Sequence, residues 1–500
     1  MIFTVPMWPI DGLSKFMLIM IACLFPMVFV YSLAYVRRNF FRYYFVLLLA
    51  LIGMVGSVLA RDLLTLYVFL EIMTVGIYFL IIDNTKKESF PAGFKYILMM
   101  FLGGLFLLLA SLMLYNLTGT FDLAAIANVA STLPQAKLGL IFGLFLIGFL
   151  FEVGTVPFHI WLPEAHPVAP SPISALLSGI AIKIGAYGVL RLMFVLGLIN
   201  STLVWAGAIS MLFGVVLALK QTNIKKLLAY SSISQMGYVV LGFGLATGLG
   251  VSGGLFHMLN HAMFKMLLFL CAGAIIFATR ERDLDKLGGL GQRMPLTTLA
   301  FAFGALAITG IPPFNGFASK ALLSAAASAA PALKVVLVLT SAGTFALMLK
   351  LFCGAFLGEL PAKLEQTKEV PWLMVLPMLL LAAGCLVVGL MAQPVLGYVA
   401  SAVGLVLDKN LWSFWLFFDA GLVILLGSGI YWLVLRSDRL QNIALWDILS
   451  LDRLSNRSVD VLVASCNKMR QLHARNLNTH LLWMIIALVI LLCFFNYLIV

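Results

Sequence analysis

The chain has 500 residues, of which 63% are hydrophobic and 10% are charged, and its mean hydropathy is +1.08. Because soluble domains carry about 25% charged residues, this composition excludes a soluble enzyme or binding domain and indicates a polytopic α-helical membrane protein. The net charge of +12 does not indicate nucleic-acid binding, since the basic residues lie in short loops at alternate helix ends, a pattern typical of membrane orientation.

Hydrophobic runs long enough to cross a bilayer recur along most of the chain. The first run is too long for a signal peptide, so we expect it to be a retained span. In chain order we predict about fourteen spans, at 14–36, 43–60, 63–82, 92–116, 137–160, 173–197, 203–219, 227–247, 253–278, 295–331, 334–357, 371–391, 413–435 and 481–499. The tenth contains ITGIPPFNGF, in which Gly310, Pro312, Pro313 and Gly316 predict a broken helix.

Two segments do not fit the pattern of spans. Residues 118–135 are typical of a short amphipathic loop helix. Residues 436–476 mix apolar and basic positions at helical spacing, which predicts an amphipathic surface helix before the last span, with a plain connector as the alternative.

The basic residues predict an orientation. If the spans alternate, one side of the membrane collects Arg37, Arg38, Arg42, Lys86, Lys87, Lys220, Lys225, Lys226, Arg280, Arg282, Lys286, Arg293, Lys363, Lys368, Arg436 and Arg439. The opposite loops hold little beyond Arg61, Lys137, Lys334 and Lys409. The basic side is therefore expected to be cytoplasmic, in a cell inner (plasma) membrane of bacterial or archaeal type, with both termini outside.

The cysteines argue against redox chemistry in this chain. The six residues are scattered singly, without a CxxC pair, which disfavours a metal centre, an iron–sulfur cluster or a disulfide framework. The sequence also lacks a nucleotide-binding loop and a nucleophile elbow. We therefore predict no cofactor in this chain.

Ionisable residues at membrane depth carry most of the functional information. A charge near the bilayer centre costs about 2.5–3.5 kcal/mol on insertion scales, so such residues are expected to face protein or water. The spans contain Glu71, Glu152, Lys183, His257, His261, Lys265 and Lys320, with Lys350 nearer the predicted cytoplasmic end. Polar packing between helices explains any one of them. A set spread over five spans instead favours a proton relay.

His257, His261 and Lys265 are spaced four apart and form one stripe on a helix face. Two such histidines could bind a metal ion, but no nearby carboxylate or cysteine completes a site, so we favour the relay. The predicted helix breaks, around Val156–Pro157 and at Gly310–Gly316, lie a few residues from Glu152 and Lys320. Paired discontinuous helices in two halves of a transporter indicate its ion path.

Four stretches carry a family resemblance: TVPFHIWLPEAHPVAPSPISALLSGIAIKIGAYGVLR, TNIKKLLAYSSISQMGY, HMLNHAMFKMLLFL and GIPPFNGFASK. They resemble the antiporter-like subunits of respiratory complex I. Those subunits are related to the large subunits of Mrp sodium/proton antiporters, membrane-bound energy-converting nickel–iron hydrogenases and formate hydrogenlyases. The resemblance covers roughly residues 10 to 390, and its first stretch is most similar to the hydrogenase and Mrp branches.

The resemblance implies two inverted repeats, each with a broken helix. The expected organisation is N-terminal spans in 1–60, a first antiporter-like half in 61–200, a second in 201–360, additional spans in 361–435, the amphipathic helix in 436–476 and a C-terminal span in 477–500. The family usually has two more spans before the run at PIDGLSKFMLIM, so we expect those helices to be absent or supplied by another polypeptide.

The resemblance also assigns roles. Glu71 matches the family glutamate that pairs with a lysine on the first broken helix, and Lys183 matches the central lysine of the next helix. His261 and Lys265, with His257 beside them, match the central pair of the second half. Lys320 matches the residue on the second broken helix, usually the exit to the outside, and Gln235 lies where some members carry a histidine.

Glu152 departs from the family pattern, because it occupies the position of the lysine that would pair with Glu71. Two acids then face each other, and one of them is expected to hold a proton unless a neighbouring subunit supplies a cation. The first half is thus a modified or inactive channel, or handles a different ion. Lys183 as the new partner of Glu71 is a further alternative.

Three functions remain open. The first is a proton-translocating subunit, with sodium-linked transport as a variant, of a redox-driven complex whose iron–sulfur arm lies in partner subunits. The second is a subunit of an Mrp-type cation/proton antiporter without a redox partner. The third is a structural membrane subunit that no longer conducts. In each case the expected partners are related antiporter-like and small membrane subunits and lipid, not nucleic acid.

Overall fold

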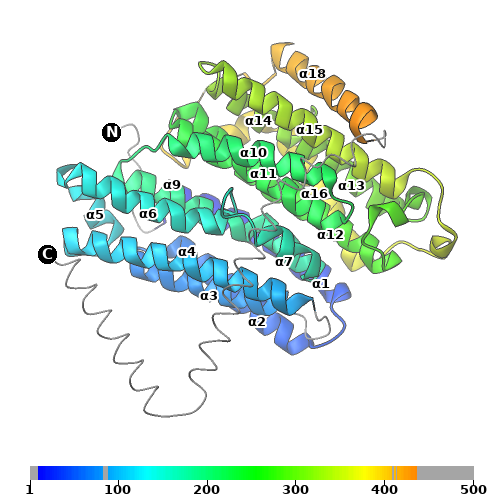
Figure 1. Cartoon of the computed structure of the whole chain (residues 1–500), viewed down its shortest axis with the longest axis horizontal. Helices are drawn as coiled ribbons and strands as arrows, with labels where there is room; N and C mark the ends of the chain where they lie inside the picture. Colours follow the sequence, from blue (N-terminus) through cyan, green and yellow to red (C-terminus); the bar gives the residue numbers. More distant parts are fainter. Residues whose placement is uncertain (1–9, 83–87, 408–409, 413, 436–500) are drawn as a thin grey trace. The chain divides into compact units, whose positions relative to one another are not determined.

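The computed structural model describes residues 10–82, 88–407, 410–412 and 414–435, and these ranges form helices and connecting turns without a β-strand (Figure 1). In this part of the chain, eleven helical stretches are long and apolar enough to cross a membrane. They are α1 (Gly12–Tyr35), α2 (Phe40–Leu59), α3 (Leu63–Ile81), α4 (Ser89–Thr118), α6 (Gln135–Val153), Ser171–Leu196, α10 (Thr202–Lys220), α12 (Gly248–Thr279), α15 (Pro331–Phe356), α16 (Trp372–Leu390) and Leu416–Leu433. The prediction of a multi-pass α-helical membrane protein is confirmed.

Other predicted elements take a different form. The predicted span 227–247 corresponds to α11 (Ile224–Leu245), which is buried along most of its length and whose serines and lysines make it less apolar than its neighbours. The loop helix expected in 118–135 is α5 (Leu123–Val129) followed by η1 (Ala130–Thr132). A short helix, α17 (Ala392–Ser401), follows α16. The surface helix predicted in 436–476 and the final span lie outside the described residues.

Both predicted helix breaks are present. The predicted span 295–331 consists of α13 (Pro295–Thr309) and α14 (Asn315–Ala326), which confirms the interruption. The predicted span 137–160 is too long, because α6 already ends at Val153 and a separate helix, α7 (Leu162–Val168), follows the turn. The first break therefore begins at Gly154 rather than at Val156–Pro157.

A glycine ends the helix before each break. Gly154 has φ +70°, and its N–H donates to the carbonyls of Leu150 and Phe151. Gly310 has φ +80°, and its N–H donates in the same way to the carbonyls of Leu306 and Ala307. Glycine adopts this left-handed conformation without a Cβ penalty, so both helices end in the same manner.

A second pattern is also repeated along the chain. The backbone of Asp62 forms an isolated antiparallel β-bridge with that of Asp122, and the backbone of Asn223 forms one with that of Asp283. The flanking backbone hydrogen bonds are Leu63 to Phe121 and Leu123 to Arg61 in the first case, and Ile224 to Arg282 and Leu284 to Thr222 in the second. Corresponding residues are 161 positions apart, as Leu63 and Ile224 show. This match indicates an internal duplication, while the domain boundaries given above stay predictions.

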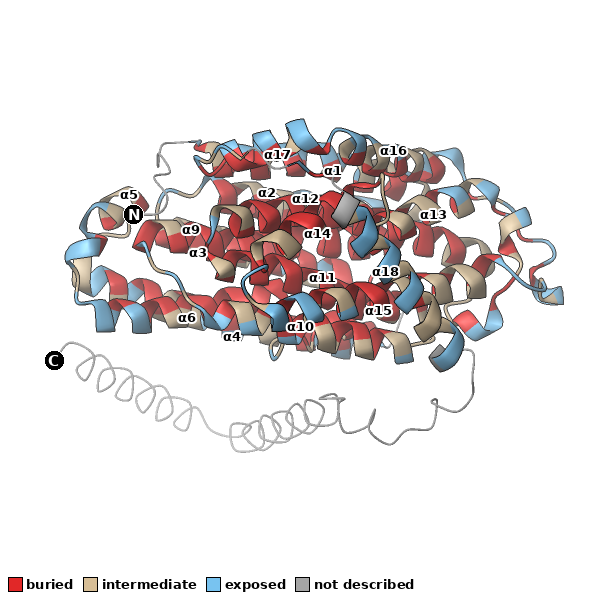
Figure 2. Cartoon of the chain, turned by 90° about the horizontal axis from the view of Figure 1, so that it is seen from above, coloured by how far each residue is buried: buried red, intermediate tan, exposed pale blue. Residues whose placement is uncertain are grey.

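The centre of the described fold contains α12 and α11, which are mostly buried in Figure 2. The stretch Ser171–Leu196 combines α8 (Ser171–Leu176), a π-helical turn η2 (Leu177–Ala181) and α9 (Ile182–Leu196), and its most apolar window is fully buried. Large apolar side chains are exposed on outer helices such as α2, where Phe41 is 88% exposed. The ionisable residues of the central helices are therefore enclosed by protein.

Candidate functional site

The two acids lie together in the first half. Thr74 on α3 donates from its Oγ1 to Oε1 of Glu152 on α6 over 3.5 Å. Glu71, one turn before Thr74 on α3, interacts electrostatically with Glu152 and with the hydroxyl of Tyr67. Among the described residues, the ion pairs within 4.0 Å are Lys95–Glu164 and Arg191–Asp11. Neither acid of this pair therefore has a cationic partner there.

Two glycines make room for these acids. A Cβ at Gly104 on α4 would lie 2.2 Å from Oε1 of Glu71, and a Cβ at Gly185 on α9 would lie 2.6 Å from the Cβ of Glu152. Glycine at these positions lets the carboxyl-bearing helices approach their neighbours closely. Since Gly185 is two residues after Lys183, the same contact brings the helix of Lys183 against α6.

Lys183 is fully buried at the start of α9. Its ammonium group donates to the backbone carbonyl of Ser178, within the π-helical turn that precedes it. The alternative in which Lys183 takes over as the ion-pair partner of Glu71 is therefore wrong for this conformation. Single π-helical turns are common at functional sites, and this one was not predicted from the sequence.

Hydrogen bonds of Ser178 and Ser232 lie between the binding sites of the Lys183 and Lys265 ammonium groups. The hydroxyls of Ser178 and Ser232 lie 2.8 Å apart, and Ser232 donates to the carbonyl of Leu228 over 3.0 Å. Lys265 on α12 donates to the same carbonyl over 2.8 Å. The Lys265 ammonium also donates to Ser231 over 2.8 Å. The predicted lysines of the two halves are thus brought together through α11.

The histidine stripe continues from Lys265 along α12. The ring of His261 lies 6.5 Å from that of His257, measured between centroids, and both rings are fully buried. His257 is hydrogen-bonded to Gln235 on α11 at 3.1 Å and to Ser319 on α14 at 3.0 Å. Both ring nitrogens of His261 lack a hydrogen-bond partner among the residues that the structure describes. Buried polar atoms of this kind are where ordered water binds.

Lys320 lies at the second helix break. Its ammonium group donates to the carbonyls of Ile308 over 2.8 Å and Thr309 over 3.2 Å. These carbonyls are left without helical partners where α13 ends at Gly310, so the cation sits at the negative end of that helix. The expected proximity of a freed carbonyl and an ionisable side chain is confirmed at this break.

A small cavity adjoins Lys320. Its volume is about 60 Å³, and its polar lining includes Tyr238, Ser341 and Asp419. Asp419 belongs to α18 (Phe414–Ile430), within the candidate span Leu416–Leu433. Sequence reasoning missed Asp419, although an aspartate inside the apolar run FWLFFDAGLVILLGSGI is itself a signal.

The remaining predicted residues contact a helix end or lie in the turns between helices. Lys350 donates to the carbonyls of Leu219 and Gln221 over 2.9 Å each, at the end of α10. Pro157 lies in the turn between α6 and α7, and Pro312 and Pro313 lie between α13 and α14. Lys350 therefore caps a helix and does not join the hydrogen bonds between Lys183 and Lys265.

His166 on α7 is a second residue that sequence reasoning missed. It is fully buried and stacks on Phe269 with ring centroids 4.5 Å apart. Neither ring nitrogen has a hydrogen-bond partner in the described part of the chain, and the ring interacts electrostatically with Lys183, Lys225 and Lys265. Lys225, expected in a loop, is instead buried within α11 and donates to the carbonyl of Ala169 over 2.8 Å. Because α7 is too short to be a predicted span, a search for ionisable residues within long spans does not find His166.

No group of three or more His, Cys, Asp or Glu side chains that could hold a metal ion occurs within the described ranges. The absence of a cofactor stays a prediction. What the arrangement offers is a set of groups that can exchange protons, buried on α6, α9 and α12 and half-buried on α3 and α14. Hydroxyls that both donate and accept hydrogen bonds are interleaved with them.

Fold and site together define a multi-pass membrane protein with titratable groups in its interior. Residues 60–346 match the transmembrane family described as NADH:quinone oxidoreductase/Mrp antiporter, and the chain belongs to this family. The family resemblance noted in the sequence is confirmed.

Three proteins of known name are similar to this chain in sequence. The chain is 36% identical over 426 residues to hydrogenase-4 component B of Escherichia coli (strain K12), covering 77% of this chain but 62% of that protein, less than two thirds of its length. It is 31% identical over 384 residues to an Na(+)/H(+) antiporter subunit of Alkalihalophilus pseudofirmus, covering 75% of this chain and 77% of that one. It is also 31% identical over 416 residues to an NADH-quinone oxidoreductase subunit of Desulforudis audaxviator, covering 78% and 83%.

Two solved complexes contain chains of similar fold. One is the Mrp complex from Dietzia sp. DQ12-45-1b, with a TM-score of 0.72, 28% identity, and coverage of 83% of this chain and 86% of that chain. The other is the membrane-bound sulfane sulfur reductase, an archaeal respiratory membrane complex, with a TM-score of 0.79, 25% identity, and coverage of 96% and 88%.

Proposed function

We propose that this chain is a proton-translocating membrane subunit of a multisubunit, redox-driven energy-converting complex. The observation that carries the proposal is the pair of fully buried lysines, Lys183 and Lys265, which are held by backbone carbonyls on either side of the hydrogen-bonded hydroxyls of Ser178 and Ser232. Buried ionisable residues inside a membrane protein are costly, and relays are among the functions that require them.

The proposed pathway runs along these titratable groups, from the half-buried Glu71 through the buried lysines and histidines. Protons pass from the Glu71–Glu152 pair to Lys183, then by way of Lys265 to the histidines. The carbonyls of Ser178 and Leu228 hold the ammonium groups in place, and the serine hydroxyls between them both donate and accept hydrogen bonds. In this proposal bridging water carries the proton between each ammonium group and the hydroxyls. Repulsion between the charges of Lys183 and Lys265, which interact electrostatically, couples the protonation of the two sites.

The exit proposed for this pathway is Lys320. His257 reaches the α14 helix of Lys320 through Ser319, the residue immediately before it. The cavity beside Lys320 then provides an acceptor in Asp419 on α18. The carbonyls of Ile308 and Thr309 hold the Lys320 ammonium at the helix break.

The wider architecture follows the family. We propose fourteen spans in all, with two inverted repeats, a cytoplasmic amphipathic helix in 436–476 and both termini outside the cell membrane. Related antiporter-like and small membrane subunits surround the chain, and a peripheral arm with iron–sulfur clusters supplies the electron transfer. In this proposal the chain itself binds no cofactor.

An Mrp-type antiporter subunit, moving protons alone or in exchange for sodium, is the second candidate function. It is supported by the similarity to an Na(+)/H(+) antiporter subunit and to a chain of an Mrp complex. The redox-driven complex is preferred because the similar chain of the archaeal respiratory complex covers 96% of this chain, against 83% for the Mrp chain.

The composition of the native complex distinguishes these two functions. The complex is purified from native membranes through an affinity tag on this chain, and its subunits are identified by mass spectrometry. Co-purification of hydrogenase-type or iron–sulfur subunits is the expected result. Recovery of small membrane subunits alone, together with cation-driven proton exchange in vesicles, would establish the antiporter instead.

A further inference from the structure

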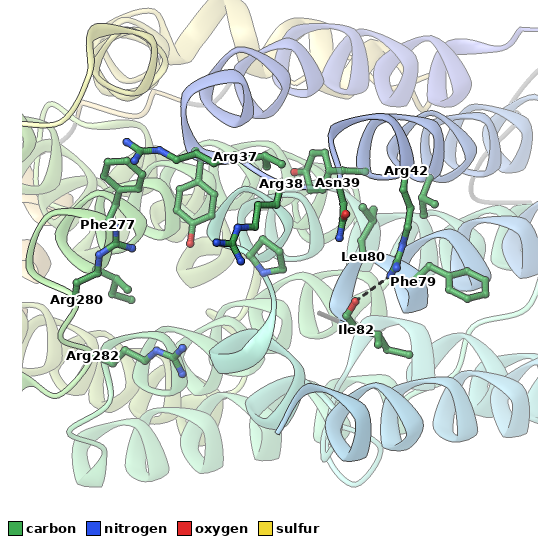
Figure 3. A pocket seen from close by; sticks show the side chains of 16 residues that line it. Arg37, Arg38, Asn39, Arg42, Phe79, Leu80, Ile82, Phe277, Arg280 and Arg282 are labelled. Atoms are coloured by element: carbon green, nitrogen blue, oxygen red, sulfur yellow. Dashed lines mark hydrogen bonds between the residues drawn. The ribbon is translucent and has the colours of Figure 1, made fainter. Parts of the chain in front are cut away.

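Five arginines surround one hollow at the ends of four helices (Figure 3). They are Arg37, Arg38, Arg42, Arg280 and Arg282, which we call the arginine pocket. Arg37 and Arg38 follow α1, Arg42 is in the first turn of α2, and Arg280 and Arg282 follow α12, while the end of α3 forms another wall. The hollow measures about 450 Å³, which is large enough for a phosphate-bearing headgroup.

The arginines of the pocket have no carboxylate partner within 4.0 Å in the described ranges. Arg42 donates to the carbonyl of Ile82 over 3.5 Å, as Figure 3 shows. Arg37 and Arg280 both lie against the ring of Phe277, at 5.1 and 5.6 Å from its centroid. These contacts orient the guanidinium groups without neutralising them.

Glu281, the acid between Arg280 and Arg282 in sequence, is engaged elsewhere. Its carboxylate accepts the backbone N–H groups of Arg282 and Asp283 over 2.9 and 3.2 Å. These backbone hydrogen bonds lower the pKa of Glu281, so it is ionised at neutral pH, yet it is directed at its own loop. The positive charge of the pocket is therefore not compensated by the residues that the structure describes.

Five guanidinium groups around one hollow repel each other unless an anion binds between them. The planar guanidinium fork matches the oxygens of phosphate, with which it forms paired, charge-assisted hydrogen bonds. The chemistry of the pocket thus favours a phosphate group. Because all of these arginines lie at the ends of membrane-spanning helices, the phosphate is expected at the depth of lipid headgroups.

An apolar surface continues from the pocket toward the membrane interior. Phe79 on α3 lines the pocket and is 46% exposed. Further exposed apolar side chains follow on the same helix, namely Val75, Val68 and Leu64. The neighbouring helix α2 exposes Phe41, Phe45, Leu48 and Ile52 at helical spacing. A free phosphate ion would make no use of this surface, whereas the acyl chains of a lipid would cover it.

We propose that the arginine pocket binds the phosphate of an anionic phospholipid whose acyl chains lie along the exposed faces of α2 and α3. This site is separate from the line of residues between Glu71 and Lys320. It joins the α1–α2 connection to the end of α12, the helix that carries His257, His261 and Lys265. The bound lipid therefore stabilises the position of α12 from outside the pathway.

The test uses the purified complex after lipid removal in detergent, with native mass spectrometry and thermal unfolding as readouts. The probes are phosphatidylglycerol, phosphatidylcholine and inorganic phosphate. The test variant is the double substitution R38Q/R282Q, and R293Q serves as the control because Arg293 is exposed and does not line the pocket. A second double variant, R37K/R280K, retains charge but loses the planar fork.

Phosphatidylglycerol is expected to bind and to raise the unfolding temperature of the wild type and of R293Q. Binding to R38Q/R282Q is expected to be weaker by about tenfold or more, because at least two charge-assisted hydrogen bonds are lost. R37K/R280K is expected to bind with intermediate affinity. Equal binding of phosphatidylcholine, stabilisation by inorganic phosphate alone, or equal lipid binding by R38Q/R282Q would each overturn the proposal. Cross-linking of residue 38 to an acidic partner subunit in native membranes would also overturn it.

Discussion

The hydroxyls of Ser178 and Ser232 lie 2.8 Å apart in the buried contact between η2 and α11. The first serine presents its carbonyl to Lys183, and the second donates to the carbonyl that also binds Lys265. One pair of small side chains therefore lies between the carbonyls that hold the central lysines of the two predicted halves. This contact is where protons or charge would pass between halves.

Replacement of Ser232 by alanine is expected to slow proton transport several-fold while the complex still assembles. A buried hydrogen bond contributes only about 1 kcal/mol to stability, so the fold tolerates the loss. The matched control is Ser234→Ala on the same helix, since Ser234 is equally buried and donates to the carbonyl of Met211 over 2.8 Å. Transport is measured with a pH-sensitive dye in vesicles. Equal rates for S232A and S234A would contradict the role of the serine contact.

Gly104→Ala is expected to impair transport without unfolding the protein. The new Cβ would lie 2.2 Å from Oε1 of Glu71, and a flexible carboxylate can move away, so Glu71 is displaced while the packing survives. Gly143→Ala in α6 is the control, because a Cβ there meets nothing within 4 Å. The alanine at 143 is expected to leave transport unchanged and to stabilise its helix by up to about 1 kcal/mol. A transport rate for G104A equal to that of G143A would show that the position of Glu71 is unimportant.

Asp419→Asn is expected to slow proton release at the Lys320 end of the pathway. The substitution keeps the size of the side chain beside the cavity but removes the carboxylate that we propose as the proton acceptor. Asp419→Glu restores a carboxylate and is expected to recover most of the rate. The measurement is proton transport at saturating driving force, with subunit content checked by gel. A wild-type rate for D419N would remove Asp419 from the pathway.

The Asp11–Arg191 ion pair is expected to stabilise the fold and to make its stability depend on pH. Burial by itself raises the pKa of Asp11. The hydrogen bond and positive charge of Arg191, together with hydrogen bonds from Ser14, outweigh this effect, so the pKa of Asp11 lies below its ordinary value. The carboxylate therefore stabilises the folded state above about pH 4, and this contribution is lost as the pH falls through the lowered pKa. Removing one partner of a buried pair costs about 3–5 kcal/mol.

Thermal unfolding in detergent between pH 7 and pH 3 tests this expectation. Asp11→Asn is expected to be less stable than the wild type at pH 7, with a difference that shrinks toward pH 3. Asp122→Asn is the control, because Asp122 caps α5 on the surface and asparagine caps helices about as well as aspartate. A constant difference between D11N and the wild type over this pH range would contradict the assignment.

Much of this structure could be predicted from hydrophobic runs and helix-breaking residues. The Gly310–Gly316 break and the stripe of His257, His261 and Lys265 follow from residue type and spacing, and both are present. The end of α6 was predicted too late, because an apolar run continues across Gly154 while the backbone does not. Hydropathy indicates which segments can lie in an apolar environment, but it does not show at which residue a helix ends.

Other features depend on tertiary contacts. The π-helical turn before Lys183 has no sequence signature, and the serine contact joins residues 54 positions apart. His166 lies on a helix of seven residues, too short to register as a span. Two further contacts depend on the direction of the side chains, which the order of residues does not reveal. They are the hydrogen bond of Thr74 to Glu152 and that of Lys183 to the Ser178 carbonyl.

The most direct test of the proton pathway is transport by the reconstituted complex carrying Lys183→Arg. Arginine keeps the positive charge but does not release its proton at physiological pH, so the account predicts an assembled complex with little proton transport. Lys137→Ala, which changes an exposed lysine at the start of α6, is expected to transport protons at the wild-type rate. Wild-type transport by K183R, at normal assembly, would contradict a relay through Lys183.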